Sequence, residues 1–344
     1  PTQHSVKELQ SVGIQPDVLV LRTEKHLSDQ VRKKVAAFCN VDFDCVIQSE
    51  DLPSIYEVPV NMQNQGLDTA ILRKMDEPIG EKPALGPWKA FLDRRNNATE
   101  VVNIGLVGKY DLQDAYKSIR ESLSHAGTYN DHKVNITFIN SEYLTEDNVA
   151  ERLKGQDGIV ICPGFGQRGI EGKIIAAHYT RTHDIPTFGI CLGMQLLFDS
   201  SDEYGFCEGL GLIPGKVTEL PPTPGLMIPH MGWNENSYVK LTPATGSQPD
   251  FSQLDKQYTY FVHSYYAVTE PEYITATADY GVAVPSVVQR DNVCGMQFHP
   301  EKSASVGIGL LREFCRSVGE LPVNGVATNA TAAPKEAYEG GVAR

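Results

Sequence analysis

The sequence has 344 residues, with 30 lysines and arginines against 43 aspartates and glutamates, giving a formal net charge of −13. Such an acidic chain lacks the basic footprint of a nucleic-acid-binding protein, and no apolar run is long enough to span a membrane. The first residues have no signal-peptide pattern, so none is expected, and the seven cysteines are scattered with no C-x-x-C pair. We therefore expect reduced thiols, no metal site and a cytoplasmic location.

The first 75 residues combine strand-like and helical patterns, with too few strands to close a sheet. Apolar and amphipathic patterns predict strands at 17–21 and 45–47 and helices at 29–38 and 66–74. Residues 76–98 contain three prolines and many polar groups, which is typical of a linker. One short helix is expected within it, at 88–92. The front of the chain is thus predicted to be an incomplete α/β segment followed by a linker.

Strand-like and helical patterns alternate from residue 99 onward, which predicts an α/β domain at 99–320 with a doubly wound, mostly parallel sheet. The expected elements are strands at 101–107, 134–139 and 158–162 and helices at 114–125 and 145–154, the latter with Thr145 as N-cap. Past Leu321 no periodicity remains, so residues 321–344 are expected to form a disordered tail.

A short apolar run ending in G-x-C-x-G surrounds Cys191 and precedes an apolar, helix-like segment. Glycines two residues before and two after a nucleophile let the backbone turn sharply from strand to helix. The thiol is then exposed above the sheet, and the N–H of Leu192 faces any anion that forms there. The pattern predicts a nucleophile elbow, although a lone G-x-C-x-G also surrounds buried structural cysteines.

A base for this thiol is expected at His299, within V-C-G-M-Q-F-H-P-E. We interpret the apolar run as a strand, in which residues i and i+2 share a face, so Glu301 can orient the His299 imidazole. The histidine can take the thiol proton and later protonate a leaving amine. Because a nucleophile, a base and an orienting group occur together, catalysis is favoured over a chance pairing at a strand end.

G-I-C-L-G-M-Q together with F-H-P-E resembles the class I glutamine amidotransferases over residues 99–318. The resemblance implies hydrolysis of L-glutamine through a cysteinyl thioester, without a cofactor, and delivery of ammonia to a synthase domain or subunit. It also implies glutamine contacts from Gly164, Leu192, Gln195, His263, Ser264 and Tyr265.

A second oxyanion donor is expected in the turn P-G-F-G that follows the strand ending at Cys162. A glycine turn at this place can aim the Gly164 N–H at the oxyanion, with the Leu192 N–H as its partner. This P-G-F-G turn is similar to the P-G-G-F-G that is usual in one family of these amidotransferases, the CTP synthases. Pro163 therefore stands where a glycine is expected, and it supplies no N–H.

The N-terminal third is similar to the end of the amidoligase domain of CTP synthase, in P-T-Q-H-S-V-K-E-L, K-V-A-A-F-C-N and S-I-Y-E-V-P. This resemblance implies that Thr2, Gln3 and Lys34 help to hold a pyrimidine nucleotide, whereas the helical pattern alone makes Lys34 a solvated charge. No G-x-x-x-x-G-K-[ST] loop occurs, so ATP and Mg²⁺ are expected only with a complete amidoligase domain. The resemblance leaves open whether the protein forms a homo-oligomer through that domain.

In the part of the sequence that follows the elbow, the chain resembles a different family. The stretches E-G-L-G-L-I-P-G-K, P-H-M-G-W-N and Y-F-V-H-S-Y-Y look like the glutaminase subunit of imidazole glycerol phosphate synthase. In that family Met231 to Trp233 would dock onto the synthase partner, while His230 and His263 also fit ordinary core histidines beside aromatic residues. We expect a glutaminase that serves CTP synthase, with the histidine-pathway synthase as the alternative. A non-catalytic regulatory or scaffolding module of the same fold is the third hypothesis.

Overall fold

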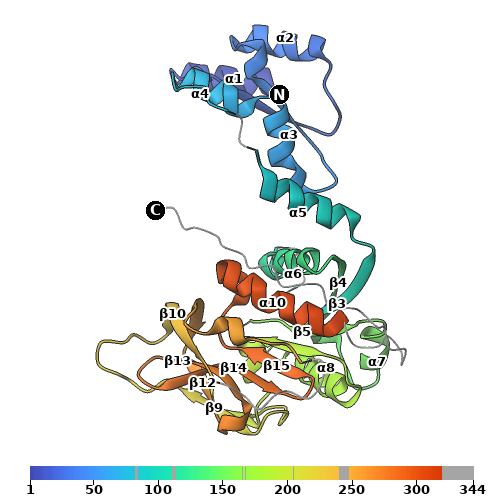
Figure 1. Ribbon diagram of the computed structural model, residues 1–344, viewed down its shortest axis with the longest axis vertical. Coiled ribbons are helices and arrows are strands. Elements are labelled where there is room, and N and C mark those ends of the chain that lie inside the picture. Colours follow the sequence, from blue (N-terminus) through green and yellow to red (C-terminus); the bar gives the residue numbers. More distant parts are fainter. Residues whose placement is uncertain are drawn as a thin grey trace. The chain divides into compact units, whose positions relative to one another are not determined.

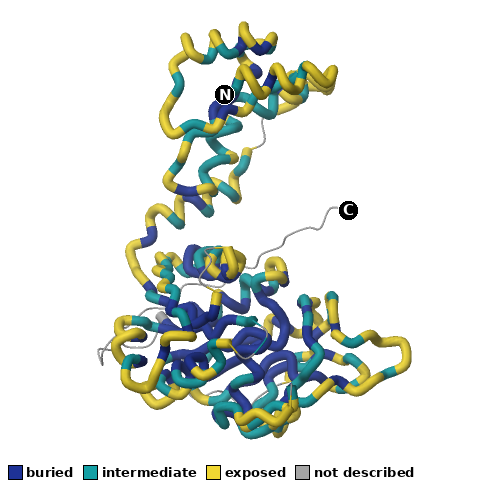
Figure 2. Tube along the Cα trace, turned by 180° about the vertical axis from the view of Figure 1, so that it is seen from behind, coloured by how far each residue is buried: buried dark blue, intermediate teal, exposed yellow. Residues whose placement is uncertain are grey.

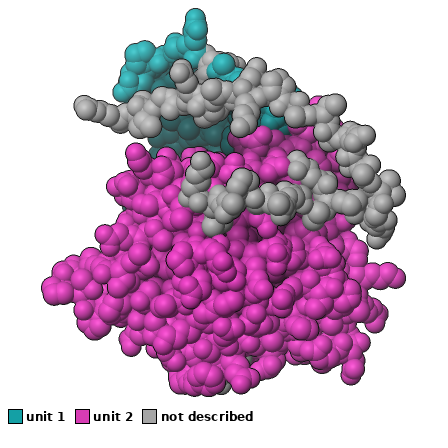
Figure 3. All heavy atoms as spheres, turned by 60° about the horizontal axis from the view of Figure 1, so that its bottom comes forward, with its two compact units in different colours: residues 1–96 teal, residues 97–344 magenta. Residues whose placement is uncertain are grey.

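The computed structural model describes residues 1–81, 84–110, 114–164, 166, 168–203, 205–239 and 248–319. The chain divides into two compact units, residues 1–96 and 97–344, which have different colours in Figure 3. The tail predicted at 321–344 lies outside the described residues. Among the residues that the structure describes, no helix is both long and apolar enough to cross a membrane.

Unit 1 is a small α/β segment, and its described residues form a two-stranded parallel sheet. Strand β1 (Leu19–Thr23) pairs with β2 (Val46–Glu50). The helices are α1 (Thr2–Ser11), α2 (Asp29–Cys39), α3 (Val58–Asn64), α4 (Leu67–Lys74) and α5 (Gly86–Asn97). Figure 2 shows that exposed and intermediate residues dominate this unit, and its apolar core is correspondingly small.

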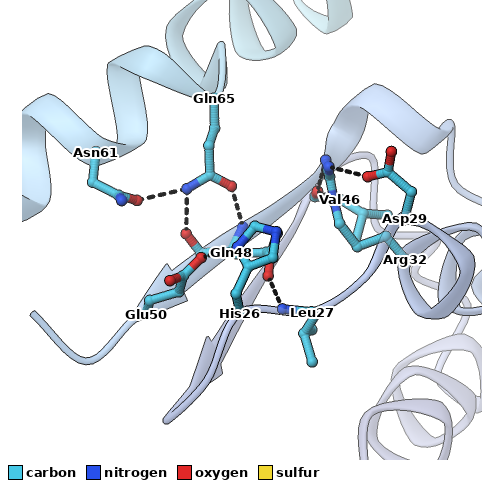
Figure 4. A network of polar contacts seen from close by, with 9 residues as sticks. All are labelled: His26, Leu27, Asp29, Arg32, Val46, Gln48, Glu50, Asn61 and Gln65. Atoms are coloured by element: carbon cyan, nitrogen blue, oxygen red, sulfur yellow. Dashed lines mark hydrogen bonds and ion pairs between the residues drawn. The ribbon is translucent and has the colours of Figure 1, made fainter.

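Polar side chains connect the two strands of unit 1 to the segments around them (Figure 4). The buried Gln48 accepts a hydrogen bond from the Leu27 N–H at 2.6 Å. The Gln65 amide bonds both backbone groups of Gln48, accepting from its N–H at 2.8 Å and donating to its carbonyl at 2.7 Å. Arg32 donates two bonds to the Val46 carbonyl. These side chains satisfy strand groups that a two-stranded sheet leaves unpaired.

The segment predicted as a linker holds a longer helix than expected, because α5 spans twelve residues. It begins at Gly86 and has Pro87 in its first turn, where a missing N–H breaks no helical bond. Trp88 Nε1 donates to the Tyr56 carbonyl at 2.8 Å, and the Phe91 ring meets the Tyr56 ring at 5.6 Å between centroids. Helix α5 thus packs against the residues around Tyr56 within unit 1.

Within its described residues, unit 2 is built on a nine-stranded mixed sheet in the order β11-β10-β13-β14-β15-β6-β5-β3-β4 (Figure 1). The parallel strands are β3 (Glu100–Gly108), β4 (His132–Asn140), β5 (Gly158–Ile161), β6 (Thr187–Ile190) and β15 (Val293–Met296). The antiparallel strands are β10 (His230–Tyr238), β11 (Tyr258–His263), β13 (Ile274–Asp279) and β14 (Ala283–Arg290). A smaller sheet contains β7 (Ser200–Ser201), β8 (Cys207–Glu208), β9 (Gly215–Glu219) and β12 (Tyr265–Thr269).

Helices cover both faces of the large sheet, as a doubly wound fold requires. One apolar cluster joins Leu106 of β3 to Leu123 of α6 (Lys117–Tyr129) and Phe314 of α10 (Ala304–Gly319). The other joins Ile159 of β5 to Ala176 of α8 (Ile170–Thr182). Figure 2 shows the buried residues concentrated around this sheet. The predicted α/β fold is confirmed, and its parallel half lies where the alternating pattern indicated.

Two helices of unit 2 differ from their predicted bounds. Helix α6 begins at Lys117 rather than at 114. The helix predicted over 145–154 is only α7 (Val149–Arg152), with Asn148 rather than Thr145 as its N-cap residue. The Asn148 side chain accepts a hydrogen bond from the Thr145 N–H at 3.0 Å, which holds a turn in front of the helix. Asparagine commonly diverts backbone groups from a helix in this way.

Candidate active site

Cys191 lies in a sharp turn between β6 and the short helix α9 (Leu192–Gln195). Its φ of 52° and ψ of −110° place a non-glycine residue in a strained region of the backbone map. The Cys191 N–H donates to the Met296 carbonyl at 2.8 Å, which anchors the turn to β15. Gly193 is required because an added Cβ would stand 2.2 Å from the Ile161 carbonyl oxygen. The turn from strand to helix has the geometry of the predicted elbow. The expectation of an exposed thiol was wrong, because Cys191 is buried, with 3% of its surface accessible.

His299 and Glu301 meet beside this turn, although not in the predicted conformation. The strand expectation for both residues was wrong, because β15 ends at Met296 and Glu301 lies in a short 3₁₀ helix, Pro300–Lys302. Pro300 favours the first helical position, so the extended chain stops at His299. His299 Nδ1 nevertheless donates to Glu301 Oε1 at 2.8 Å, and both side chains are buried. This bond leaves Nε2 as the ring atom available to the thiol.

The electrostatic surroundings of His299 favour its protonated form. Burial disfavours the charged imidazole, but hydrogen bonds to Cys191 and Glu301, with the charges of both groups, outweigh burial and raise the pKa of His299 to about 9. The histidine therefore holds a proton at neutral pH between the thiol and the carboxylate. A thiol next to such a pair can be activated as a nucleophile.

Gln297 also contacts the nucleophile, and the sequence interpretation missed it. Its Nε2 lies 3.8 Å from the Cys191 sulfur, and its Oε1 accepts from Gln195 Nε2 at 3.1 Å. Gln195 donates in addition to the Tyr265 carbonyl at 2.9 Å. The alternation that pointed to His299 and Glu301 would have indicated Gln297 as well, since it precedes His299 by two residues.

The predicted oxyanion loop follows β5. Gly164 has a φ of 144°, and an added Cβ would lie 3.1 Å from Lys109 Cε, so glycine suits this position. The carbonyls before it are held from outside the loop, Cys162 by Lys173 Nζ at 2.8 Å and Pro163 by the Tyr116 hydroxyl at 3.4 Å. The roles of Gly164 and Leu192 as oxyanion donors stay predictions.

A small cavity beside the nucleophile brings most of the predicted glutamine contacts together. It is lined by Cys191, Leu192, Gln195, Glu203, His263, Ser264 and Tyr265. A larger cavity of about 720 Å³ shares Leu192, Gln195 and Glu203 with it. Glu203 was not predicted; burial raises the pKa of its carboxyl, and it is the acidic group common to both cavities. Its only signal in the sequence is an acidic pair shortly after the elbow.

His230 and His263 form a buried pair behind this cavity. His263 Nδ1 donates to the Tyr265 carbonyl at 2.9 Å, so its Nε2 accepts from His230 Nδ1 at 3.1 Å. Burial lowers the pKa of His230 to about 4, and burial with the nearby His230 charge lowers that of His263 to about 3. Both rings are thus neutral core side chains, in line with one of the two sequence interpretations, and His263 has no ring nitrogen left for a ligand.

The histidine pair is expected to make the fold sensitive to acid. Both histidines bind protons near pH 6.5 in the unfolded chain but only near pH 4 and 3 when folded. The unfolded state therefore binds more protons as pH falls below 6.5, and stability decreases by up to about 1.4 kcal/mol per pH unit for each histidine. Denaturant unfolding between pH 7 and 4.5 should show a shallower pH slope for His230→Gln than for the wild type. The same slope in both would contradict this account, and the exposed His178→Gln is the control.

The predicted nucleotide contacts lie in unit 1, apart from this site in the sequence. Thr2 and Gln3 begin α1, the first half-buried and the second exposed, and Lys34 is exposed on α2. Their role stays a prediction. Met231 and Trp233, predicted to face a partner, are 60% and 53% exposed on β10.

Comparison with known proteins relates both units to described families. A model of the family "Glutamine amidotransferase class-I" matches residues 111–317, and one of "CTP synthase N-terminus" matches residues 1–76. CTP synthase of Bacteroides thetaiotaomicron is 70% identical over 199 residues, which are 57% of this chain and 37% of that protein. CTP synthase of Porphyromonas gingivalis W83 is 58% identical over 198 residues, again 57% and 37%. The chain thus spans little more than a third of the length of these relatives.

Among solved structures, the glutaminase domain of Trypanosoma brucei CTPS with bound acivicin is similar to 63% of this chain and 93% of its own length. The TM-score is 0.50 and the sequence identity 23%, so the likeness concerns the fold.

Proposed function

Because the chain belongs to the class I glutamine amidotransferase family, we propose that residues 99–320 are a glutaminase domain, hydrolysing L-glutamine to glutamate and ammonia. The observation that carries the proposal is Cys191 on a strained elbow, together with the hydrogen bond of His299 Nδ1 to Glu301 beside it. This chemistry needs a nucleophile, a base and oxyanion donors, and no cofactor. All seven cysteines are described and free, which suits a reducing compartment such as the cytoplasm.

In the proposed mechanism, the proton of Cys191 resides on His299 as an imidazolium, and the thiolate sulfur attacks the side-chain amide carbon of glutamine. The N–H groups of Gly164 and Leu192 stabilise the oxyanion that forms. His299 then gives its proton to the leaving nitrogen, which departs as ammonia and leaves a thioester on Cys191. A water molecule deprotonated by His299 hydrolyses the thioester to glutamate. Glu301 holds the imidazole in the required tautomer throughout.

We assign Glu203 to the α-ammonium group of the bound glutamine. It lines the cavity next to Cys191, and a carboxylate is the natural partner of a primary ammonium. The Nε2 of Gln195 already donates to Gln297 and Tyr265, so we assign the contact of Gln195 with glutamine to the rest of its side chain. Ser264 and Tyr265 line the same cavity and complete the proposed substrate contacts.

Labelling with an electrophilic glutamine analogue, which carries a reactive carbon in place of the side-chain amide, tests the proposal. Cys191 should be modified faster than the other six cysteines, and an excess of L-glutamine should protect it. Mass spectrometry of the digested protein identifies the modified residue. If Cys191 stays unmodified while other thiols react, the chain is a non-catalytic module of the same fold.

For the ammonia acceptor we propose a CTP-forming amidoligase. Residues 1–76 match the CTP synthase N-terminus, and residues 1–75 would be the end of that domain, joined by the linker at 76–98. ATP and Mg²⁺ would bind a complete amidoligase domain, with Thr2, Gln3 and Lys34 near the nucleotide and any homo-oligomer formed through that domain. A pull-down against both candidate partners tests the assignment. Stable pairing with the (β/α)₈ cyclase of imidazole glycerol phosphate synthase, and none with an amidoligase domain, would reverse it.

We expect the isolated chain to hydrolyse glutamine slowly. Pro163 fixes its own φ and restricts Cys162, so the Gly164 peptide is harder to align without a partner. Loss of an oxyanion donor costs about 10²–10³ in turnover. Pro163→Gly should therefore increase ammonia release while the rate of Cys191 alkylation by iodoacetamide stays the same. Fast wild-type hydrolysis, or a parallel rise in both rates, would show that this loop is not limiting.

A further inference from the structure

Lys173 is a fully buried lysine that the proposed mechanism leaves without a role. It lies in the first turn of α8, whose side chains tilt back toward the helix N-terminus and hence toward the end of β5. Its Nζ donates to the Cys162 carbonyl at 2.8 Å. Among the described residues, that carbonyl is the one hydrogen-bond acceptor that the structure gives to this ammonium.

Stability does not explain a lysine at this place. Burial, with repulsion from Lys109, lowers the pKa of Lys173 to about 8, while the Cys162 and Cys191 thiols act in the opposite direction. The first turn of a helix also repels cations. Buried charges with few partners usually destabilise a protein relative to apolar side chains of similar size. A cost of this kind is typical of residues retained for function.

The position of the bond indicates that function. Pro163 and Gly164 immediately follow Cys162. The peptide bond between Cys162 and Pro163 has no N–H that could donate a hydrogen bond, because proline lacks one. The Cys162 carbonyl is the remaining polar group of that peptide, and Lys173 holds it. The Tyr116 hydroxyl holds the next carbonyl, that of Pro163. Two successive peptides in front of Gly164 are thus fixed from the protein interior.

We propose that Lys173 is a positioning residue for amide hydrolysis: its ammonium orients the peptides before Gly164 so that the Gly164 N–H points at the oxyanion. The inference rests on the proposed glutaminase function and adds a residue to it. Lys173 touches neither the substrate nor the reacting atoms in this account. It acts through the backbone of the loop, which must hold its donor within a few tenths of an ångström of the correct place.

Lys173→Met tests the proposal, because methionine has a similar length but cannot donate. We expect kcat for glutamine to fall about 10–100-fold, somewhat less than the loss of a whole oxyanion donor. KM should change less than about threefold, and alkylation of Cys191 by iodoacetamide, which forms no oxyanion, should also stay within about threefold. The unfolding midpoint should be equal to or above that of the wild type. Arg181→Met, at an exposed position of the same helix, is the matched control.

Two results would overturn the proposal. An unchanged kcat would show that the loop does not need Lys173, and a lowered unfolding midpoint with equal losses of kcat and alkylation would show general structural support. If the wild type releases no ammonia at all, the glutaminase proposal itself fails. Binding of an aldehyde analogue of glutamine, whose carbonyl carbon adds the Cys191 sulfur and whose oxygen takes the proton, then decides about Lys173. An affinity weakened at least tenfold in Lys173→Met supports positioning, and an equal affinity refutes it.

Discussion

Alanine in place of Cys191 is expected to lower the rate of glutamine hydrolysis by about 10⁴-fold or more, since removal of a covalent nucleophile leaves only binding and oxyanion stabilisation. The variant is expected to keep its fold, because alanine is smaller and the thiol contacts of Gln297 and the Val262 carbonyl, at 3.8 Å each, are weak. Ammonia release should be measured in a Pro163→Gly background, because the protein that retains Cys191 is expected to hydrolyse glutamine faster there than with Pro163.

Cys39→Ala is the matched control for this experiment. Cys39 is buried like Cys191 but lies in unit 1, at the end of α2. Its replacement should leave the hydrolysis rate within about twofold, as expected for a substitution remote from the site. A Cys191→Ala protein that hydrolyses glutamine at the rate of its Cys39→Ala counterpart would remove the basis for the proposed thioester.

The second large effect is expected at Gly193, where alanine should destabilise unit 2 by about 3 kcal/mol, because forced overlap in a packed interior commonly costs 1–3 kcal/mol or more. The new Cβ would stand 2.2 Å from the Ile161 carbonyl oxygen, and neither backbone segment can move without disturbing β5 or α9. A shift of about 1 Å in α9 would also misplace Cys191 and lower turnover by about 10²-fold. Urea unfolding and ammonia release measure the two effects.

Gly86→Ala is the control for the glycine substitution. No atom lies within 4 Å of a Cβ built at Gly86, and its φ is not positive. Alanine there should change the free energy of unfolding by no more than about 1 kcal/mol, in the stabilising direction that helix propensity predicts. Equal losses of stability in both variants would mean that the close approach of Gly193 to Ile161 does not determine the stability of the elbow.

The elbow and the contact between His299 and Glu301 could be predicted because their signals are local. The two glycines that flank Cys191 indicate a backbone that turns sharply and lies close to another strand. The spacing of His299 and Glu301 correctly predicted that they meet, although Pro300 changes the conformation that brings them together. The parallel half of the sheet was also accessible, since strands alternate there with helices.

The rest depends on contacts that no local pattern records. Between the antiparallel strands β10, β11, β13 and β14, the described residues form only β12 and short 3₁₀ helices. The rule that strands alternate with α-helices therefore does not predict these strands. Lys173 looks like an ordinary charge in the first turn of a helix until the fold buries it beneath Cys162. Glu203 becomes a functional candidate only because the fold places it in the wall of the cavity beside Cys191.

The pairing of β6 with β15 has a consequence during synthesis of the chain. Ile190 lies opposite Met296, so the strand that leads to His299 is translated about a hundred residues after Cys191. At about 5–20 residues per second, Cys191 spends roughly 5–20 s on the ribosome without His299. For that interval the thiol lacks the proton acceptor that we propose for it. Reactivity of Cys191 toward a glutamine-like electrophile therefore reports completion of the whole domain, and a nascent chain truncated before β15 stays silent to such a probe.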